Sequence, residues 1–240
     1  VYRMGDLDFE ANLRDGVAVD WPIRYAEIAP WYDRVERFIG VSGMAEGLAH
    51  LPDMQFLPPM PFNVAEQHVR ERIADRFKGE RLMTIGRVAV VTQRHLRRSA
   101  CHDCGPCHRG CVSKSYFSSL NSTLPAAEAT GRLTLRPWSV VRSLTYDPQR
   151  RRISAAQVVD AQSGAEVEFT GLVVFLCASA IESARILLNS ASPAFPNGLA
   201  NGSDQVGRNI MDHIKWGGAS GTFEQWPDKR VVGSRPNGIY

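Results

Sequence analysis

The sequence predicts a mixed α/β fold that combines helices, an antiparallel β-meander, one strand–helix unit and an inserted cysteine-rich loop. Apolar residues recur at helical spacing in 30–39 and 64–77 and alternate loosely across 141–169. At 172–176 they form an uninterrupted run directly before a helical pattern. The chain has 240 residues, 44% hydrophobic and 22% charged, which is enough to build a core and excludes a largely disordered protein.

Two helices are expected in the first third of the chain. Pro30 suits a first helical turn, and apolar residues then recur at helical spacing as far as Ile39, where a glycine follows. Four prolines exclude regular structure from 51–63, whose apolar side chains must pack on a protein core or on a cofactor. Asn63 and Glu66 then form the capping box of the second helix.

The rest of the chain is expected to be mostly β before a last helix. Residues 172–176 are typical of a strand buried on both faces. Ser179 and Glu182 are expected to cap a helix over 179–190, and this βα unit can present the N-terminus of its helix to a phosphate or a polar cofactor edge, although most such units bind no ligand. A partial helix is expected within 118–130, and strands at 82–92, near 141–146, at 153–159 and at 167–169.

Four of the five cysteines fall within eleven residues, in the pattern C-x2-C-x2-C-x3-C. Bacterial-type ferredoxins use this run for iron–sulfur ligands, whereas structural zinc sites usually use two pairs with a longer spacer. Disulfides that close such small loops would stabilise the fold little. The pattern therefore favours an iron–sulfur cluster, either 3Fe–4S or 4Fe–4S, with zinc or free or paired thiols as alternatives. The ligands would be Cys101, Cys104, Cys107 and Cys111.

Basic residues surround this cysteine loop. The net charge of +3 is too small to indicate binding to nucleic acid or to an anionic membrane, and no apolar run approaches the roughly 20 residues of a membrane helix. Between Arg81 and Lys114, however, there are seven basic residues and one acid, Asp103. Such a stretch is usually a solvated face, but here it would offset the negative charge of a thiolate-ligated cluster. The alternative function is a zinc-stabilised module that binds nucleic acid or protein.

Two segments resemble the glucose–methanol–choline (GMC) oxidoreductase family. They are VVFLCASAIESARILLNS at 173–190 and VGRNIMDH at 206–213. Ala191 stands where this family usually has glycine, and Glu182-Ser183 replaces the usual Ser/Thr-Pro, as in the branch close to pyranose oxidases and bacterial FAD-dependent sugar dehydrogenases. That branch includes glucoside 3-dehydrogenases and the large subunits of gluconate and glucose dehydrogenases. Because the opening segment and the cysteine loop resemble it too, the resemblance covers most of the chain.

The resemblance implies the central part of a GMC-type FAD-binding, Rossmann-like fold. It implies that a dehydrogenase oxidises a sugar or glycoside hydroxyl to a carbonyl with FAD, and that electrons leave through the iron–sulfur cluster to a partner protein. A small accessory subunit and a cytochrome-type acceptor are the expected partners, with no nucleic acid and no membrane span. The same analogy implies a periplasmic location, with the cytoplasm as the alternative.

The resemblance also implies which residues lie near FAD. Val141 matches a strand residue whose backbone meets the adenine. Because the family's catalytic histidine lies much closer to the C-terminus, we expect His213 to be structural and assign no catalytic residue. The other matches are Cys177, Ala178 and Ser179 in the small-residue turn beside the cofactor, and Asn209, Asp212 and His213 in a segment near the flavin domain.

Two parts of the family pattern have no counterpart in the sequence: a GxGxxG with a following acidic residue, and the region of the catalytic histidine. We therefore expect a fragment of a longer enzyme that neither binds FAD tightly nor turns over alone. The expected division is a region of the FAD and substrate domains at 1–95, the cluster loop at 96–116, part of the FAD-binding domain at 117–216 and the truncated start of the substrate domain at 217–240.

Overall fold

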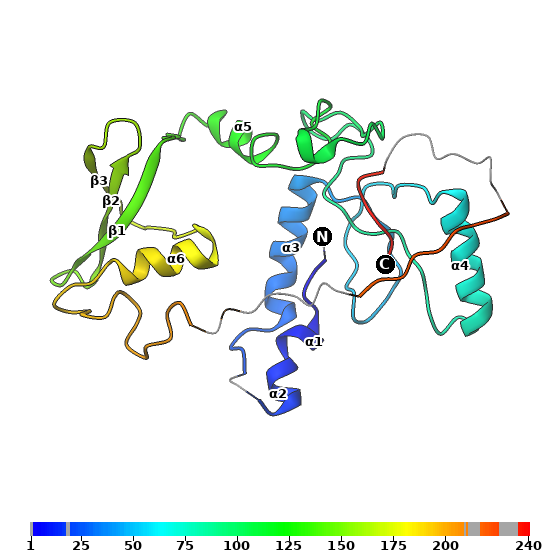
Figure 1. Cartoon of the computed structure of the whole chain (residues 1–240), viewed down its shortest axis with the longest axis horizontal. Coiled ribbons are helices and arrows are strands. Elements are labelled where there is room, and N and C mark those ends of the chain that lie inside the picture. The colour runs from blue at the N-terminus through cyan, green and yellow to red at the C-terminus, as the bar shows by residue number, and fades with distance from the viewer. Residues whose placement is uncertain (1, 18–19, 209, 211–216, 226–234) are drawn as a thin grey trace. The chain divides into compact units, whose positions relative to one another are not determined.

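The chain folds into two compact units, seen in Figure 1. The computed structural model describes residues 2–17, 20–208, 210, 217–225 and 235–240. Unit 1 comprises Val1–Leu133 and Gly221–Tyr240, and unit 2 comprises Thr134–Ser220. None of the described helices combines the length and the apolar character needed to cross a membrane. The functional division expected from the sequence stays a prediction.

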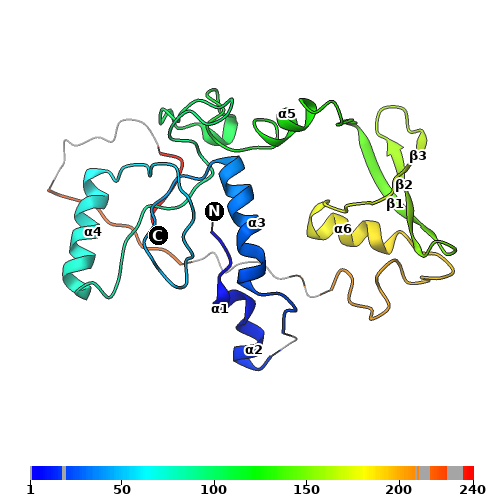
Figure 2. The same cartoon turned by 180° about the vertical axis from the view of Figure 1, so that it is seen from behind.

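Unit 1 consists of helices joined by long irregular segments (Figure 2). Its third helix confirms the predicted helix but begins earlier, at Tyr25 rather than Pro30. The Glu27 carboxylate accepts a hydrogen bond of 2.8 Å from the backbone N–H of Arg24 and so caps this earlier start. Pro30 therefore lies inside the helix, where it cannot donate a backbone hydrogen bond. The helices are α1 (Asp6–Phe9), α2 (Ala11–Asp15), α3 (Tyr25–Ile39), α4 (Val64–Phe77), the 3₁₀ turn η1 (Cys107–Arg109) and α5 (Thr123–Glu128).

The predicted capping box of α4 is confirmed. Glu66 N donates to Asn63 Oδ1 at 2.9 Å, and Asn63 N donates to Glu66 Oε2 at 2.8 Å. The same carboxylate accepts two hydrogen bonds from Arg235, at 2.6 and 2.8 Å, so that it joins α4 to the C-terminal segment. Hydrogen bonding to Arg235 is the main reason that the pKa of Glu66 lies below its usual range.

Residues 82–92 do not form the predicted strand. Each part of this segment pairs with a different partner through an isolated bridge: Ile85 with Ile239, Val88 with Ser42, and Val90 with Tyr116. Ile85, Val90 and Val91 are nonetheless fully buried, because the surrounding loops cover them. The apolar pattern correctly indicated that this segment is buried. Several loops bury it, however, and it is not paired in one continuous strand ladder.

The C-terminal residues pair with the same buried segment. Thr84 and Tyr240 exchange both backbone hydrogen bonds, at 2.8 and 2.9 Å, and Gly86 N donates to Gly238 O at 2.9 Å. A Cβ atom at Gly86 would lie 2.8 Å from the Gly238 carbonyl oxygen, so this close approach requires glycine. The two sequence segments of unit 1 are thereby paired with each other.

The proline-rich loop at 51–63 packs on a protein core, as one of the two alternatives predicted. Phe56 packs against a buried cluster of Ile39, Val41 and Ala89. The guanidinium of Arg87 lies 4.8 Å from the Phe56 ring centroid and donates to Asp53 Oδ1 at 2.7 Å. The loop is therefore held by apolar contact on one side and by a buried cation on the other.

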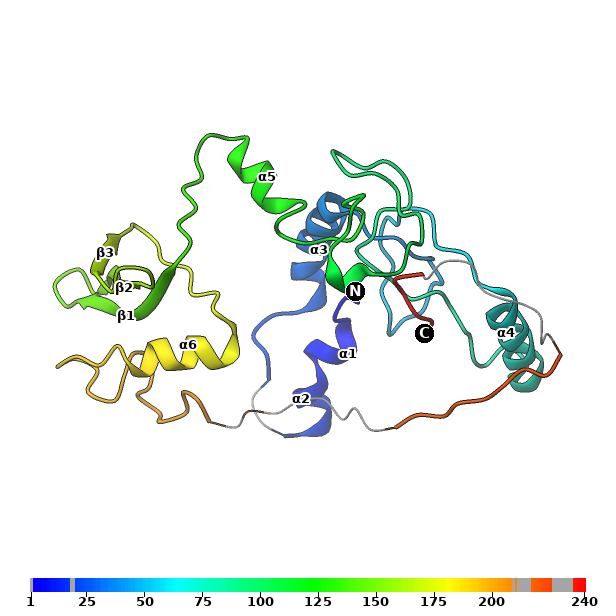
Figure 3. The ribbon, with the colours of Figure 1, turned by 45° about the horizontal axis from the view of Figure 1, so that its top comes forward.

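Unit 2 confirms the predicted β-meander. Its strands β1 (Ser139–Asp147), β2 (Arg152–Asp160) and β3 (Glu166–Thr170) form one antiparallel sheet in that order. Helix α6 (Ser179–Leu188) lies along this sheet, as Figures 1 and 3 show. Leu144 of β1, Ile186 of α6 and Leu199 form the buried core between them.

Two details of the predicted βα unit are wrong. Residues 172–176 form no strand, and Leu172 and Phe175 are 82% and 84% exposed. An all-apolar strand needs neighbouring strands and two covered faces. Within the described residues no strand pairs with this segment, and only Val174 and Leu176 pack against the core. Ser179 does not cap α6, because Ala178 occupies the N-cap position and Ser179 has φ +72°. Glu182 instead accepts a hydrogen bond of 2.9 Å from Arg185.

Replacing Ser190 should destabilise unit 2. The buried Ser190 hydroxyl accepts from Leu144 N at 2.8 Å and donates to Ile186 O at 2.6 Å, so that it links β1 to α6. We expect Ser190→Ala to cost about 1–3 kcal/mol, since the buried Leu144 N–H loses its acceptor. Chemical denaturation measures this cost. Ser203→Ala, at an exposed position, is the control, and equal effects of the two variants would contradict the assigned role.

The Glu66–Arg235 pair should give pH-dependent stability. A carboxyl group whose pKa is depressed in the fold contributes stability above its unfolded pKa and loses that contribution as pH falls through the folded pKa. Glu66→Gln should therefore cost about 1–2 kcal/mol at pH 7 and much less at pH 3. Denaturation curves at both pH values test this. Glu71→Gln, on an exposed part of α4, should change neither curve.

Candidate functional site

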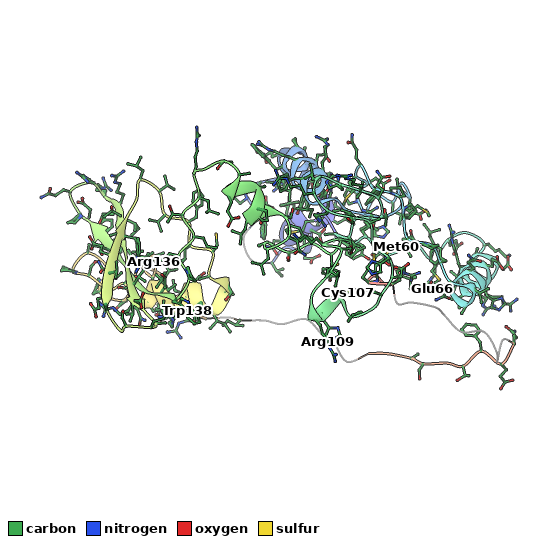
Figure 4. All side chains as sticks on the ribbon, turned by 90° about the horizontal axis from the view of Figure 1, so that it is seen from above. Met60, Glu66, Cys107, Arg109, Arg136 and Trp138 are labelled. Carbon is green, nitrogen blue, oxygen red and sulfur yellow. The ribbon has the colours of Figure 1, made fainter. Side chains whose placement is uncertain are left out.

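The cysteine loop is anchored on the buried segment of unit 1. Cys101 N donates to Val91 O at 2.9 Å, and Val91 N donates to Ser115 O at 3.0 Å, so both arms of the loop join the same residue. Between the arms the chain turns through Gly105 and Gly110, whose φ angles are +97° and +116°. Figure 4 shows Cys107 and Arg109 on η1, with the Arg109 side chain directed outward.

All four clustered cysteines line one small cavity within unit 1. His102, Tyr116 and Pro236 also contribute to its wall. All five cysteines of the chain are free thiols, and Cys177 lies exposed in unit 2. Nevertheless, no group of three or more His, Cys, Asp or Glu side chains in the described part of the chain is arranged to hold a metal ion. The thiols thus share a cavity without forming a ligand set, and their role as ligands stays a prediction.

The four thiols differ in their electrostatic surroundings. Burial raises the pKa of Cys101. Burial, and then the negative charge of the other three cysteines, raises the pKa of Cys107. Burial also acts to raise the pKa of Cys111, but hydrogen bonds from Ser113, Ser115 and the backbone outweigh it and lower the pKa to about 7. Cys111 is accordingly more readily present as a thiolate, the form that binds metals, than Cys101 or Cys107.

Side chains that sequence reasoning did not assign surround Cys111. Its sulfur lies 3.2 Å from Ser115 Oγ and 3.4 Å from Ser113 Oγ, and Tyr116 N donates to it at 3.4 Å. Arg98, which is buried, donates to the backbone carbonyls of Lys114 and Ser115. Ser113 and Ser115 were the sequence signal that could have indicated these contacts, because hydroxyl groups that donate hydrogen bonds stabilise a thiolate.

The residues expected near FAD that the structure describes all lie in unit 2. Val141 of β1 and Ala178 of the turn before α6 pack against the same core cluster. Arg185 of α6 donates to the Val141 carbonyl oxygen at 2.8 Å, an acceptor contact that sequence reasoning missed. Cys177 and Ser179 are exposed. The structure therefore brings Val141 and the turn together, whereas Asn209, Asp212 and His213 lie outside the described residues.

Comparison with known protein families shows the family to which this chain belongs. Residues 20–215 match the profile of the family described as GMC oxidoreductase. The chain belongs to the GMC oxidoreductase family. The match covers well over half of the sequence, including the cysteine loop of unit 1 and the sheet of unit 2.

Individual GMC relatives support this membership at modest identity. The 2-methyl-1,2-propanediol dehydrogenase of Mycolicibacterium austroafricanum is 29% identical over 217 residues, 88% of this chain. The 6'''-hydroxyparomomycin C oxidase of Streptomyces lividus is 29% identical over 224 residues, 87% of this chain. The fructose dehydrogenase large subunit of Gluconobacter japonicus is 25% identical over 210 residues, 86% of this chain. The chain matches only 37–38% of the length of these relatives.

Membership of the GMC family implies that FAD is the cofactor, and the residues of unit 2 fit part of a site for it. The turn at Cys177, Ala178 and Ser179 consists of small residues, two of them exposed, and no side chain caps the helix that follows. The first backbone N–H groups of α6 are therefore open to a polar ligand group. Val141 packs against the same core as Ala178 of this turn.

Proposed function

We propose that this protein is an FAD-dependent dehydrogenase that oxidises a hydroxyl group of a sugar, glycoside or polyol to a carbonyl. The observation that carries the proposal is the GMC family match over residues 20–215. It is supported by relatives whose names describe oxidation of a diol, of an aminoglycoside and of fructose. Those names include both dehydrogenases and oxidases, so the choice of dehydrogenase rests on the cysteine loop.

The residues of unit 2 would hold part of the cofactor. When bound, FAD supplies the acceptor for the hydride that leaves the substrate carbon. The backbone of Val141 and the turn at 177–179 would lie against the cofactor, because small side chains let a ligand approach the main chain closely. Asn209, Asp212 and His213 are proposed to complete this part of the site, with His213 in a structural role.

We further propose that Cys101, Cys104, Cys107 and Cys111 ligate an iron–sulfur cluster that passes electrons singly to a protein acceptor. Support comes from the ferredoxin-type spacing and from the shared cavity. An oxidase that reduces dioxygen directly needs no such relay, so a cluster favours a dehydrogenase. A cytochrome-type acceptor, an accessory subunit and a periplasmic location belong to the same proposal by analogy with sugar dehydrogenases.

Metal analysis tests the cluster. Protein purified without oxygen should contain iron and inorganic sulfide and should absorb broadly near roughly 400 nm. Cys104→Ser should remove most of the iron, whereas Cys177→Ser should not. The two cysteines make a matched pair because both are exposed and they lie in different units. Colourless protein that contains zinc alone would support the zinc-stabilised module instead.

Flavin content tests the cofactor contact in unit 2. In the full-length protein, Cys177→Leu should weaken FAD binding about tenfold, because a larger side chain in the turn keeps the cofactor from the backbone; this corresponds to about 1.4 kcal/mol. Bound flavin measured by absorbance gives the result. Ala161→Leu, in the exposed turn between β2 and β3, is the control.

Substrate reduction of the flavin tests the activity itself. Addition of the correct sugar, glycoside or polyol to the anaerobic full-length protein should bleach the oxidised flavin absorption. If no member of a broad panel of these compounds does so, the proposed substrate class is wrong. The 240-residue chain alone should hold less than one FAD per chain, and full occupancy would contradict its interpretation as part of a larger site.

A further inference from the structure

A cavity of about 360 Å³ lies in unit 1 between helix α5, the end of α3 and the turn at 95–98. Pockets that bind small molecules usually measure roughly 300–1,000 Å³, so this cavity is large enough for a ligand. Figures 1 and 3 show α5 beside the C-terminal end of α3. No cysteine is among the described residues that line the cavity, which is therefore separate from the cysteine site. Its apolar lining consists of Phe38, Leu96, Pro125, Ala126 and Ala129.

One wall of this cavity is a tight turn that is fixed to α3. His95 and Arg98 exchange both backbone hydrogen bonds, at 3.0 and 3.1 Å, and Leu96 lies at the tip between them. His95 Nε2 donates to Phe38 O at 3.2 Å, and Arg98 Nη1 donates to Ile39 O. Leu96 has φ +52°, which is uncommon for any residue with a side chain, and it is 60% exposed. The turn thus holds an exposed apolar side chain in place at the cavity.

The cavity also contains a buried hydroxyl group that has no protein partner. Ser122 is 8% exposed and occupies the N-cap position of α5, but its side chain makes no capping hydrogen bond. Within the described residues, this hydroxyl makes no other hydrogen bond either. A buried hydroxyl without a partner is costly, and a polar group of a ligand in the cavity would satisfy it.

The charged side chains around the cavity are all positive. Arg97 lines it and is exposed, and its side chain forms no ion pair or hydrogen bond within the described part of the chain. An adjoining hollow of about 620 Å³ shares Phe38 and Leu96 with the cavity and adds Arg34 and Arg37. Neither Asp nor Glu is among the described residues that line either space. The electrostatics therefore favour an anionic ligand.

We propose that this cavity binds a small organic acid with an apolar body, of the kind represented by a medium-chain carboxylate. The apolar body would lie against Phe38, Leu96 and Pro125. The carboxylate would accept a hydrogen bond from the Ser122 hydroxyl and lie near the Arg97 guanidinium, and such charge-assisted contacts are stronger than neutral ones. This inference does not depend on FAD or on the cysteine site, because every lining residue belongs to another part of unit 1.

Calorimetric titration of the full-length protein with octanoate tests the site. We expect saturable binding of one octanoate per chain, about fivefold tighter than that of octanol, which has the same chain length but no charge. Ala126→Phe places a large side chain in the cavity and should abolish the binding of both compounds. Glu128→Phe is the matched control, since Glu128 is an exposed residue of α5 outside the described lining.

Two further variants test the polar groups. Arg97→Gln removes the charge and should weaken octanoate binding about fivefold without changing octanol binding. Ser122→Ala removes the hydroxyl and should also weaken octanoate binding about fivefold. Because this hydroxyl caps no helix N–H group, its loss should leave the fold intact. Arg94→Gln and Ser119→Ala are the controls, as both residues are exposed and lie outside the described lining.

Each contrary outcome has a distinct meaning. Octanoate binding that does not saturate, or that is equal in the wild type and in Ala126→Phe, would overturn the site. Equal affinities for octanoate and octanol in the wild type would overturn the anionic ligand class. If Ala126→Phe does not fold, Arg97→Gln still decides, because it changes an exposed side chain and an unaltered octanoate affinity would contradict the proposal.

Discussion

The irregular segments of unit 1 are joined by the buried guanidinium groups of Arg87 and Arg98, which donate to backbone carbonyl oxygens. Irregular segments leave backbone carbonyl groups without the partners that helices and sheets provide, and buried carbonyl groups need donors. A guanidinium offers five N–H donors in a fixed plane, so one side chain can satisfy carbonyls from separate loops. Arg87 joins the proline-rich loop to the buried segment, and Arg98 joins α3 to the cysteine loop. Hydrogen bonds from buried arginine side chains therefore connect the segments of unit 1, whereas backbone hydrogen bonds of a sheet connect the strands of unit 2.

Local patterns predicted the parts of the fold that local interactions determine. The capping box of Asn63 and Glu66 and the β-meander of unit 2 needed only neighbouring residues, and both are confirmed. The start of α3 was missed because the backbone N–H of Arg24 is capped by Glu27, a residue type that does not mark a helix start by itself. The strand expected at 172–176 is absent. A strand is stabilised by pairing with neighbouring strands, and no described strand pairs with this segment.

Only the part of the candidate site that depends on local sequence could be predicted. Cysteine spacing predicted a shared set of metal ligands, which stays a prediction, although the four thiols do line one cavity. The polar shell around Cys111 arises from how the loop folds back. Arg98 looked like one member of a basic stretch, and only its burial separates it from the exposed Arg97. Composition cannot reveal such a difference, because both residues carry the same charge in adjacent positions. Family membership likewise indicates the fold, but it does not define a substrate, because substrate choice depends on individual side chains.

Unit 1 is discontinuous in the sequence, and this has a consequence for the order of folding. Pro236 forms part of the wall of the cysteine cavity, and residues 238–240 pair with residues 84–86. All of unit 2 lies between these partners in the sequence. During synthesis from the N-terminus, the cysteine loop therefore emerges well before its last wall does. The nascent chain passes through a stage in which the thiols are present and the cavity is still open.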